Sequence, residues 1–220
     1  METITEAAST PFLWGVAMTV LGVAGVLLAQ WQGQRAGTWV FKPLASAGFV
    51  LAALGVGATE SLYGRVMLFG LLACAAGDVL LIFRSSRVFL AGIAAFLVGH
   101  LAFASAFVVR GVSAPTSLLA VLALVPFVRL VVGWLRPHLE GPMKPAVFVY
   151  IAVISCMVAL AVGTHVREPS MLVLVGALAF FLSDLAVARE RFVAPGFVNR
   201  LWGLPLYYGA QLLLAASIPA

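Results

Sequence analysis

Eight apolar segments, each close to the length that crosses a membrane, take up nearly the whole chain. A helix needs roughly 20 apolar residues, at about 1.5 Å each, to span the hydrocarbon core of a bilayer. The connectors between the segments are too short to hold a soluble domain, so we expect residues 1–220 to form one integral-membrane domain. The predicted fold is all-α, a polytopic transmembrane bundle of eight spans. The predicted spans are residues 12–30, 39–58, 65–83, 88–109, 115–135, 145–163, 171–188 and 198–217.

The composition agrees with a membrane protein, since 63% of the residues are hydrophobic and only 10% are charged. Such a balance excludes an ordinary soluble domain. The segments lack the alternation with period two that a transmembrane β-barrel requires. The first ten residues contain no Lys or Arg, so the first apolar segment is interpreted as a retained span and not as a signal peptide. The expected location is a bacterial plasma membrane.

Basic residues are distributed unequally between the two sets of loops, and this asymmetry predicts the orientation of the chain. The positive-inside rule places the richer set in the cytoplasm and both termini on the other side. The net charge of +5 is therefore interpreted as a topology signal, and no nucleic-acid partner is expected. The odd-numbered loops and their flanks hold nine basic residues against three on the opposite side: Arg35, Lys42, Arg84, Arg87, Arg136, Lys144, Arg189, Arg191 and Arg200 against Arg65, Arg110 and Arg167.

The only two aspartates of the chain, Asp78 and Asp184, both lie inside apolar segments. A carboxylate within a bilayer costs several kcal/mol unless it is paired, hydrated or protonated, so such a residue is a candidate functional group. Asp78 stands five residues before Phe83 and Asp184 five before Arg189, which places both about 8 Å inside the same boundary. Two carboxyls in one poorly hydrated site would not both ionise easily, and the pair could supply an acid and a base.

The two halves of the chain resemble each other weakly. Lys42 precedes Pro43 as Lys144 precedes Pro145, and Asp78 follows 36 residues after Lys42 as Asp184 follows 40 after Lys144. Matching spans are four apart, so they run in the same direction. One interpretation is a parallel 4+4 repeat that places the two aspartates across the centre of the bundle. A chance match is the alternative, because few residues correspond.

Other polar residues form a column that opens toward the basic loops. Lys42 and Arg129 lie near that boundary, where they would either bind a lipid phosphate or extend their charges to the interface. His100 and Gln211 lie deeper, at about 18 Å from the boundary. The candidate supporting residues of the site are His100, Tyr150, Ser183, Tyr207, Tyr208 and Gln211.

Each of these residues also has a purely structural interpretation. The aspartates could form salt bridges to Lys42 and Lys144, and His100 could be a hydrogen-bonded packing residue. No HExxH-type spacing supports a metal site, and the chain has no nucleotide-binding motif, so neither a metal nor any other cofactor is expected. Ser183 has no His base at a suitable spacing and is interpreted as a residue that packs between helices or supports Asp184.

Several motifs together give the chain a family resemblance. The stretches FKPLAS, GDVLLIF, FLVGHLAF, FFLSDLAVARERF and LYYGAQ each occupy the expected place in a span. With them, the sequence resembles the YhhN-type lysoplasmalogenase family of eight-span membrane proteins over nearly its whole length. The resemblance implies hydrolysis of the vinyl ether bond of lysoplasmalogens to a fatty aldehyde and a glycerophospho-base. It also implies that Asp78 and Asp184 are the catalytic acidic pair.

The chemistry of that reaction suits two carboxyls, as it does in glycosidases, because both reactions pass through an oxocarbenium-like state. The expected partners are then a lysophospholipid substrate and the membrane lipids; the oligomeric state is left open. The principal alternative is a small transporter that carries protons or cations on the aspartate pair. A lipid-binding membrane protein without catalysis is a third interpretation.

Overall fold

A computed structural model describes residues 2–83 and 85–218 of the chain, with side chains from residue 10 onward. Arg84 and Ala220 lie outside the described residues. Within them the chain is all-helical and contains no strand. The long helices are α1 (Glu2–Trp31), α2 (Arg35–Gly55), α3 (Leu62–Leu80), α4 (Ser86–Arg110), α5 (Ala114–Leu135), α6 (Met143–Arg167), α7 (Met171–Ala188) and α8 (Phe197–Ala216).

The helices follow the predicted spans closely, so the eight-helix bundle expected from the sequence is confirmed. Seven of the described helices, α1 to α7, are long and apolar enough to cross a membrane. The remaining helix, α8, carries Asn199, Arg200 and two tyrosines, which lower its mean hydropathy. It packs along α7 inside the bundle and fits as the eighth span.

Local sequence signals set several helix ends. The Ser61 hydroxyl accepts a hydrogen bond from the Gly64 N–H at 2.9 Å and caps α3, and Ser170 caps α7 in the same way. Such side chains satisfy N–H groups that the first helical turn leaves free. Gly33, between α1 and α2, has a φ of 71°, a conformation that favours glycine. Short connections of this kind make consecutive helices antiparallel neighbours.

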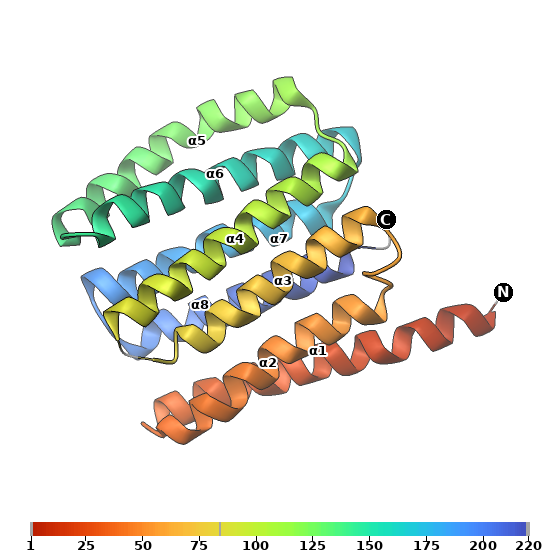
Figure 1. Ribbon diagram of the computed structural model, residues 1–220, viewed down its shortest axis with the longest axis horizontal. Helices are drawn as coiled ribbons and strands as arrows, with labels where there is room; N and C mark the ends of the chain where they lie inside the picture. The colour runs from red at the N-terminus through yellow and green to blue at the C-terminus, as the bar shows by residue number, and fades with distance from the viewer. Residues whose placement is uncertain (1, 84, 219–220) are drawn as a thin grey trace.

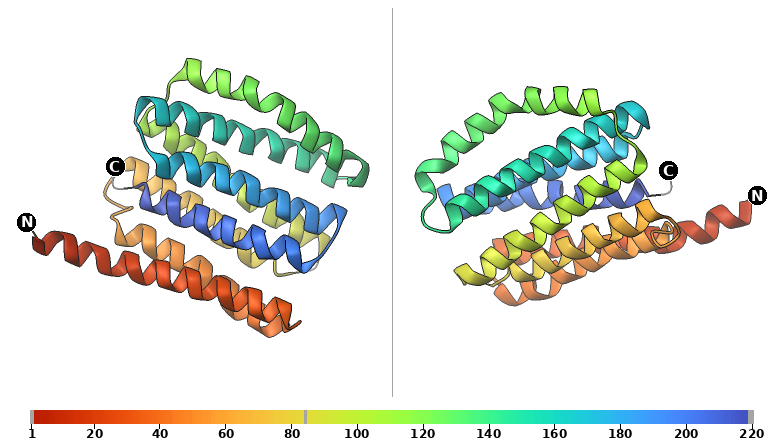
Figure 2. Two further views of the ribbon diagram at one scale, coloured as in Figure 1. Left: turned by 180° about the vertical axis from the view of Figure 1, so that it is seen from behind. Right: turned by 45° about the horizontal axis from the view of Figure 1, so that its top comes forward.

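Six helices form a ring in the order α2, α3, α4, α6, α7 and α8, with α8 closing against α2. Helix α1 packs outside the ring on α2 and α8, and α5 packs outside it on α6. Figures 1 and 2 show these two outer helices at opposite edges of the bundle. The neighbours in the second half correspond to those in the first, as a parallel 4+4 repeat would require. The repeat itself stays an interpretation.

Small residues let the helices approach closely. A Cβ added to Gly22 of α1 would lie 2.7 Å from Ala45 of α2, and one added to Gly99 of α4 would lie 2.6 Å from the Cys74 sulfur of α3. Glycine at these contacts is typical of helix packing in membranes, where close backbone approach takes the place of the hydrophobic effect. These contacts fix the distances between the ring helices and therefore the width of the space inside.

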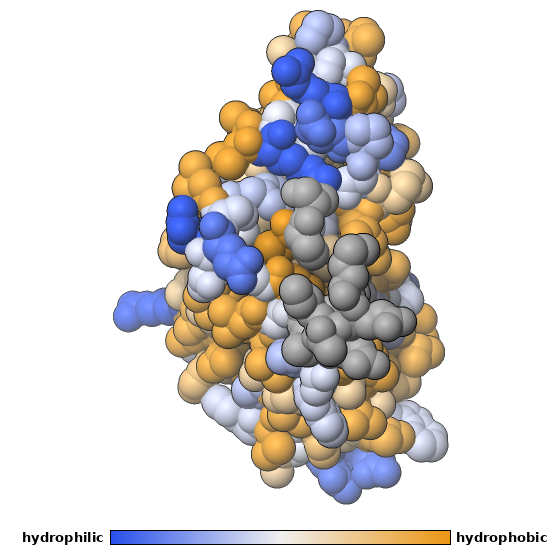
Figure 3. Space-filling view, turned by 90° about the vertical axis from the view of Figure 1, so that its right-hand side faces the viewer, coloured by the Kyte–Doolittle hydropathy of each residue, from blue (hydrophilic) through white to orange (hydrophobic). Residues whose placement is uncertain are grey.

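The outer surface of the bundle is apolar along its length. Helix α5 buries only Ser117 and Leu135 and exposes side chains such as Leu122 and Leu130 outward. Figure 3 shows the end that carries the N-terminus, where hydrophilic side chains gather, with hydrophobic side chains along the flanks. Seven apolar helices with apolar outward faces make this a multi-pass integral membrane protein.

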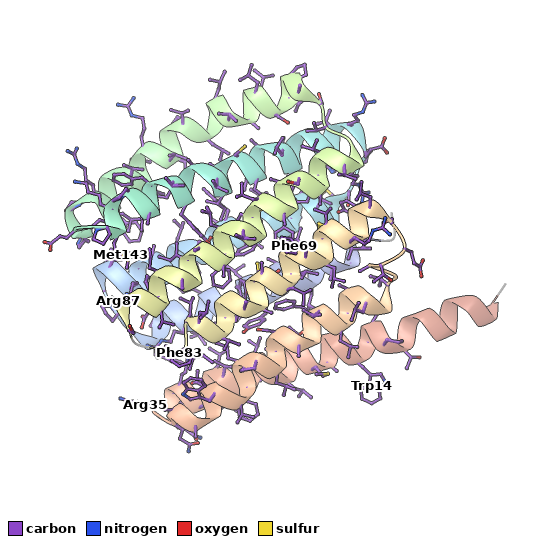
Figure 4. The ribbon with its side chains drawn as sticks, viewed as in Figure 1. Trp14, Arg35, Phe69, Phe83, Arg87 and Met143 are labelled. Atoms are coloured by element: carbon purple, nitrogen blue, oxygen red, sulfur yellow. The ribbon has the colours of Figure 1, made fainter. Side chains whose placement is uncertain are left out.

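The opposite end, here called the basic end, consists of the connections α1–α2, α3–α4, α5–α6 and α7–α8. Figure 4 shows Arg35, Phe83, Arg87 and Met143 there, away from Trp14 and Phe69. A 3₁₀ turn (η1, Arg136–His138) follows α5 at this end, and a π-helical turn (η2, Arg189–Val193) follows α7.

Candidate active site

A cavity of about 780 Å³ extends from the basic end into the ring of six helices. Its rim includes the exposed residues Gln34, Arg35 and Arg191, so the cavity is open at this end. Deeper inside, Asp78 of α3 and Asp184 of α7 both line its wall. The volume lies within the usual range for small-molecule sites, and Lys42, Tyr150 and Tyr207 line the cavity beside the two carboxyls.

Asp78 is buried and held by three side chains. The Lys42 ammonium lies 3.3 Å from Oδ1, and the Ser46 and Tyr207 hydroxyls each donate to Oδ2 at 2.7 Å. Lys42 Nζ also donates to the main-chain carbonyl of Asp78 at 3.0 Å. Ser46 follows Lys42 by one helical turn, so both project from the same side of α2. A cation and two hydroxyl donors together suit an ionised carboxylate.

Asp184 has fewer partners. The Tyr150 hydroxyl donates to Oδ2 at 2.8 Å, and Nε2 of His100 lies 3.6 Å from the same oxygen. The imidazole is fully buried, and its Nδ1 lies 2.7 Å from the main-chain carbonyl of Phe96. A carbonyl only accepts, so Nδ1 carries a proton, and in neutral His100 the Nε2 atom is an acceptor. That Nε2 has no hydrogen-bond partner in the described part of the chain.

One aromatic ring separates the surroundings of the two carboxyls. The Phe180 ring centroid lies 4.3 Å from that of His100, which neighbours Asp184, and 5.4 Å from that of Tyr207, which bonds Asp78. This apolar layer excludes water from the inner side of the site, which strengthens the electrostatic interactions there. The two carboxyls therefore share one cavity, but each has its own set of partners.

Three other residues expected to support the site lie beside it and do not line the cavity. The Tyr208 hydroxyl donates to the main-chain carbonyl of Lys42 at 3.4 Å and so helps to place α2. Gln211 is fully buried, and its amide atoms form no hydrogen bond with the described residues. Ser183 donates to the carbonyl of Phe180 at 2.7 Å, within its own helix, and forms no hydrogen bond with the Asp184 carboxyl in the described part of the chain.

Two basic residues lie elsewhere than expected. Arg129 is exposed on α5 and is absent from the cavity wall, which α5 forms through Val128 and Val131. The prediction that Arg129 faces the cavity is therefore wrong, because its side chain is exposed and does not line the cavity. Lys144 forms no ion pair with Asp184, so the pairing of Lys42 with Asp78 has no counterpart in the second half.

Other residues of the site were not predicted from the sequence. Ser46 contacts Asp78 without lining the cavity, and its spacing of four from Lys42 indicates a shared helix face. Arg191 and Arg200 were interpreted only as topology signals, yet both line the cavity rim. Arg191 follows Asp184 by seven residues, or two helical turns, and this spacing was the available signal.

The arrangement is suited to moving protons. It offers two carboxyls, a buried imidazole and three phenol or hydroxyl groups around one space. No group of three or more His, Cys, Asp or Glu side chains in the described ranges is arranged to hold a metal ion. The groups present can donate a proton, accept one and stabilise a nearby positive charge.

Comparisons with known proteins identify the family. Residues 37–218 match the YhhN family. The chain is 34% identical over 185 residues to the lysoplasmalogenase TMEM86A of Bos taurus, covering 81% of this chain and 72% of that protein. It is 30% identical over 212 residues to a lysoplasmalogenase of Mycobacterium tuberculosis, covering 93% of this chain and 78% of that protein. No solved structure is significantly similar to it. The match spans seven of the eight long helices, α2 to α8, and the chain belongs to the YhhN family.

Proposed function

We propose that this protein is a membrane hydrolase that cleaves the vinyl ether bond of lysoplasmalogens, such as lysoplasmenyl-ethanolamine or -choline. The products are a fatty aldehyde and a glycerophospho-base. The observation that carries the proposal is that two membrane-embedded carboxyls, Asp78 and Asp184, line one cavity open at a single end of the bundle. The relatives named lysoplasmalogenase support it and favour a hydrolase over a transporter.

The reaction requires an acid and a base in turn. A proton is added to the β-carbon of the vinyl ether, which leaves an oxocarbenium ion. Water attacks this ion as a base removes one of its protons, and a hemiacetal forms. The hemiacetal then breaks its bond to the glycerol oxygen, which takes up a proton, while its own hydroxyl loses one and becomes the aldehyde. The net change is the addition of one water, with no oxidation or reduction.

We assign the acid role to Asp184. Its Oδ2 accepts a hydrogen bond from the Tyr150 hydroxyl and lies 3.6 Å from Nε2 of His100, which has no hydrogen-bond partner in the described residues. Asp184 thus lacks the lysine and the second hydroxyl donor that suit Asp78 to the ionised form, and a neutral carboxylic acid fits this buried position. The proton of the Asp184 carboxyl is the one delivered to the β-carbon, and His100 is a positioning residue because it does not line the cavity.

We assign the base role to Asp78. Lys42, Ser46 and Tyr207 hold it in one geometry as an anion. From the wall of the cavity, this fixed carboxylate stabilises the oxocarbenium ion and accepts a proton from the attacking water. Each acid or base role of this kind typically contributes ~10²–10⁴-fold to the rate.

The test is aldehyde release by the purified protein in detergent. A lysoplasmenyl lipid should be cleaved, whereas the matched lipid with a saturated ether should not, because it has no carbon–carbon double bond to protonate. A transporter needs two compartments and would release no aldehyde in detergent. Absence of aldehyde from a folded, monodisperse preparation, across a range of headgroups and chain lengths, would reject the proposed function.

A further inference from the structure

We propose that Arg191 binds the phosphate of the lysolipid headgroup at the cavity rim and thereby sets how deep the ether bond lies. The proposal rests on the proposed function and names the part of the same cavity that recognises the substrate. Lys42 and Arg129 were the two candidates for this role in the sequence, but Lys42 is paired with Asp78 and Arg129 does not line the cavity.

The basic side chains that line the cavity differ in whether a carboxylate already pairs with them. Four of them line the cavity, namely Arg35, Lys42, Arg191 and Arg200. Lys42 is paired with Asp78, and Arg200 donates to Glu190 Oε1 at 2.6 Å. Arg35 and Arg191 have no carboxylate partner in the described ranges. Of these two, Arg191 is held at the cavity wall, because its guanidinium stacks on the Phe89 ring, 4.3 Å from the centroid.

The geometry of the Arg191 guanidinium at the cavity rim also suits a phosphate. A guanidinium stacked by one face keeps its N–H edge free in the plane, and that edge matches two oxygens of a phosphate. The turn that carries Arg191 is fixed, because Glu190 Oε2 accepts from the Gly196 N–H at 2.7 Å and from the Asn199 amide at 2.8 Å. Asn199 is buried. The Arg191 side chain therefore projects from an anchored π-helical turn, a feature often found at functional sites.

The distance along the helix from Asp184 to Arg191 also suits the length of a lysolipid. Arg191 follows Asp184 by two helical turns along the same wall, a rise of about 10 Å. In a lysoplasmalogen, seven bonds separate the phosphorus from the β-carbon of the vinyl ether, or about 8 Å when extended. A phosphate on Arg191 thus places the β-carbon at the level of the carboxyls. A phosphate on Lys42, which contacts Asp78, would push the ether past them toward the buried Phe180 layer.

The experiment measures binding of a lysolipid that the enzyme cannot cleave, the saturated-ether 1-alkyl lysophospholipid. Binding to the wild type, Arg191→Gln, Arg191→Lys and Arg87→Gln is compared in detergent. Arg87 is the matched control, since it is exposed at the same end and does not line the cavity. Arg191→Gln should weaken binding about 10- to 100-fold, the range for a lost charge-assisted contact, and Arg191→Lys should weaken it less. Arg87→Gln should leave binding unchanged.

Two further ligands decide what Arg191 recognises. The same ether lipid without its phosphate, 1-alkylglycerol, should bind all four proteins alike; equal weakening by Arg191→Gln would mean a general structural defect and overturn the proposal. Inorganic phosphate should compete only weakly. If it competes as well as the lysolipid, the site binds free anions and the lipid assignment is wrong. Unchanged lysolipid binding by Arg191→Gln also overturns it.

The binding test is independent of turnover. If lysolipid binding depends on Arg191 but no vinyl ether is cleaved, the proposed hydrolysis fails and the phosphate subsite stands. If aldehyde is released normally and Arg191→Gln changes neither binding nor KM, the subsite fails and the hydrolase stands.

Discussion

The Lys42 ammonium of α2 contacts Asp78 of α3 twice, at 3.3 Å from the side-chain Oδ1 and at 3.0 Å from the main-chain carbonyl. This ion pair joins two ring helices at the level of the candidate active site. Lys42 is buried like its partner, so the pair is shielded from solvent. Lys42 therefore belongs to the surroundings of the Asp78 carboxylate and not to the cavity rim where a lipid headgroup would bind.

Lys42→Met should therefore destabilise the protein by about 3–5 kcal/mol, because it leaves a buried carboxylate without its counter-ion. The double variant Lys42→Met/Asp78→Asn should recover much of that stability, since no unpaired charge remains, but should recover no activity. Thermal unfolding in detergent and aldehyde release measure the two effects. Equal stability of the wild type and Lys42→Met would show that the pair contributes little.

Asp78→Asn and Asp184→Asn should each lower kcat for vinyl ether hydrolysis by at least about 100-fold while the protein stays folded. Asn nearly preserves the shape of Asp but cannot transfer a proton. The losses should not add in the double variant, because the two residues act as a unit. Full activity in either single variant would remove that carboxyl from the mechanism.

His100→Gln should lower kcat and leave KM nearly unchanged, since His100 lies behind Asp184 and does not line the cavity. Glutamine fills similar space but does not place an imidazole nitrogen beside Asp184. Ser105→Ala, an exposed position on the same helix, is the control and should behave as the wild type. A rise in KM with constant kcat would indicate that His100 acts on substrate binding instead.

Gly77→Val should reduce both stability and activity. A Cβ at Gly77 would lie 2.7 Å from the ring of Phe96, which lines the cavity, so the larger side chain must displace that ring. Gly133→Ala is the matched control: no atom lies within 4 Å of its added Cβ. That change should be neutral or stabilising by up to about 1 kcal/mol, because alanine favours helix. A Gly77→Val protein as stable and active as the wild type would contradict the packing described here.

The orientation of the bundle can be tested with single cysteines in a Cys156→Ser background, since Cys156 is exposed and Cys74 is buried. Arg87→Cys at the basic end should react with a membrane-impermeant maleimide only after cells are opened. Glu168→Cys, exposed at the other end, should react in intact cells. The reverse pattern would place the cavity mouth outside the cytoplasm.

The sequence predicted the helices well because each apolar segment has a length that a membrane demands. Except for α1, which begins ten residues before its predicted span, the observed helices begin and end within a few residues of the predictions. The depth of Asp78 and Asp184 in the membrane, inferred from the fixed rise of each helical residue, stays a prediction. Both residues do line one cavity. Their catalytic role stays a prediction.

The rotation of each helix about its axis was harder to predict. Arg129 has a suitable depth but the wrong direction, because α5 is apolar on nearly all sides and its pattern does not reveal which side meets α6. The weak internal symmetry likewise suggested that Lys144 could pair with Asp184. The neighbours of the Asp184 carboxyl are instead Tyr150 and His100. Such partners depend on how two helices pack, and one sequence does not encode that in any local pattern.

The opening of the cavity at the basic end, with buried His100 and Gln211 beyond its inner part, has a consequence for the membrane around the protein. On the proposed function, the enzyme draws only on lysolipids in the leaflet that borders that end. Lipids of the opposite leaflet become substrates only as fast as they cross the bilayer. The two products also leave into different phases, the aldehyde into the hydrocarbon and the glycerophospho-base into water, so neither accumulates at the mouth that admits the next lipid.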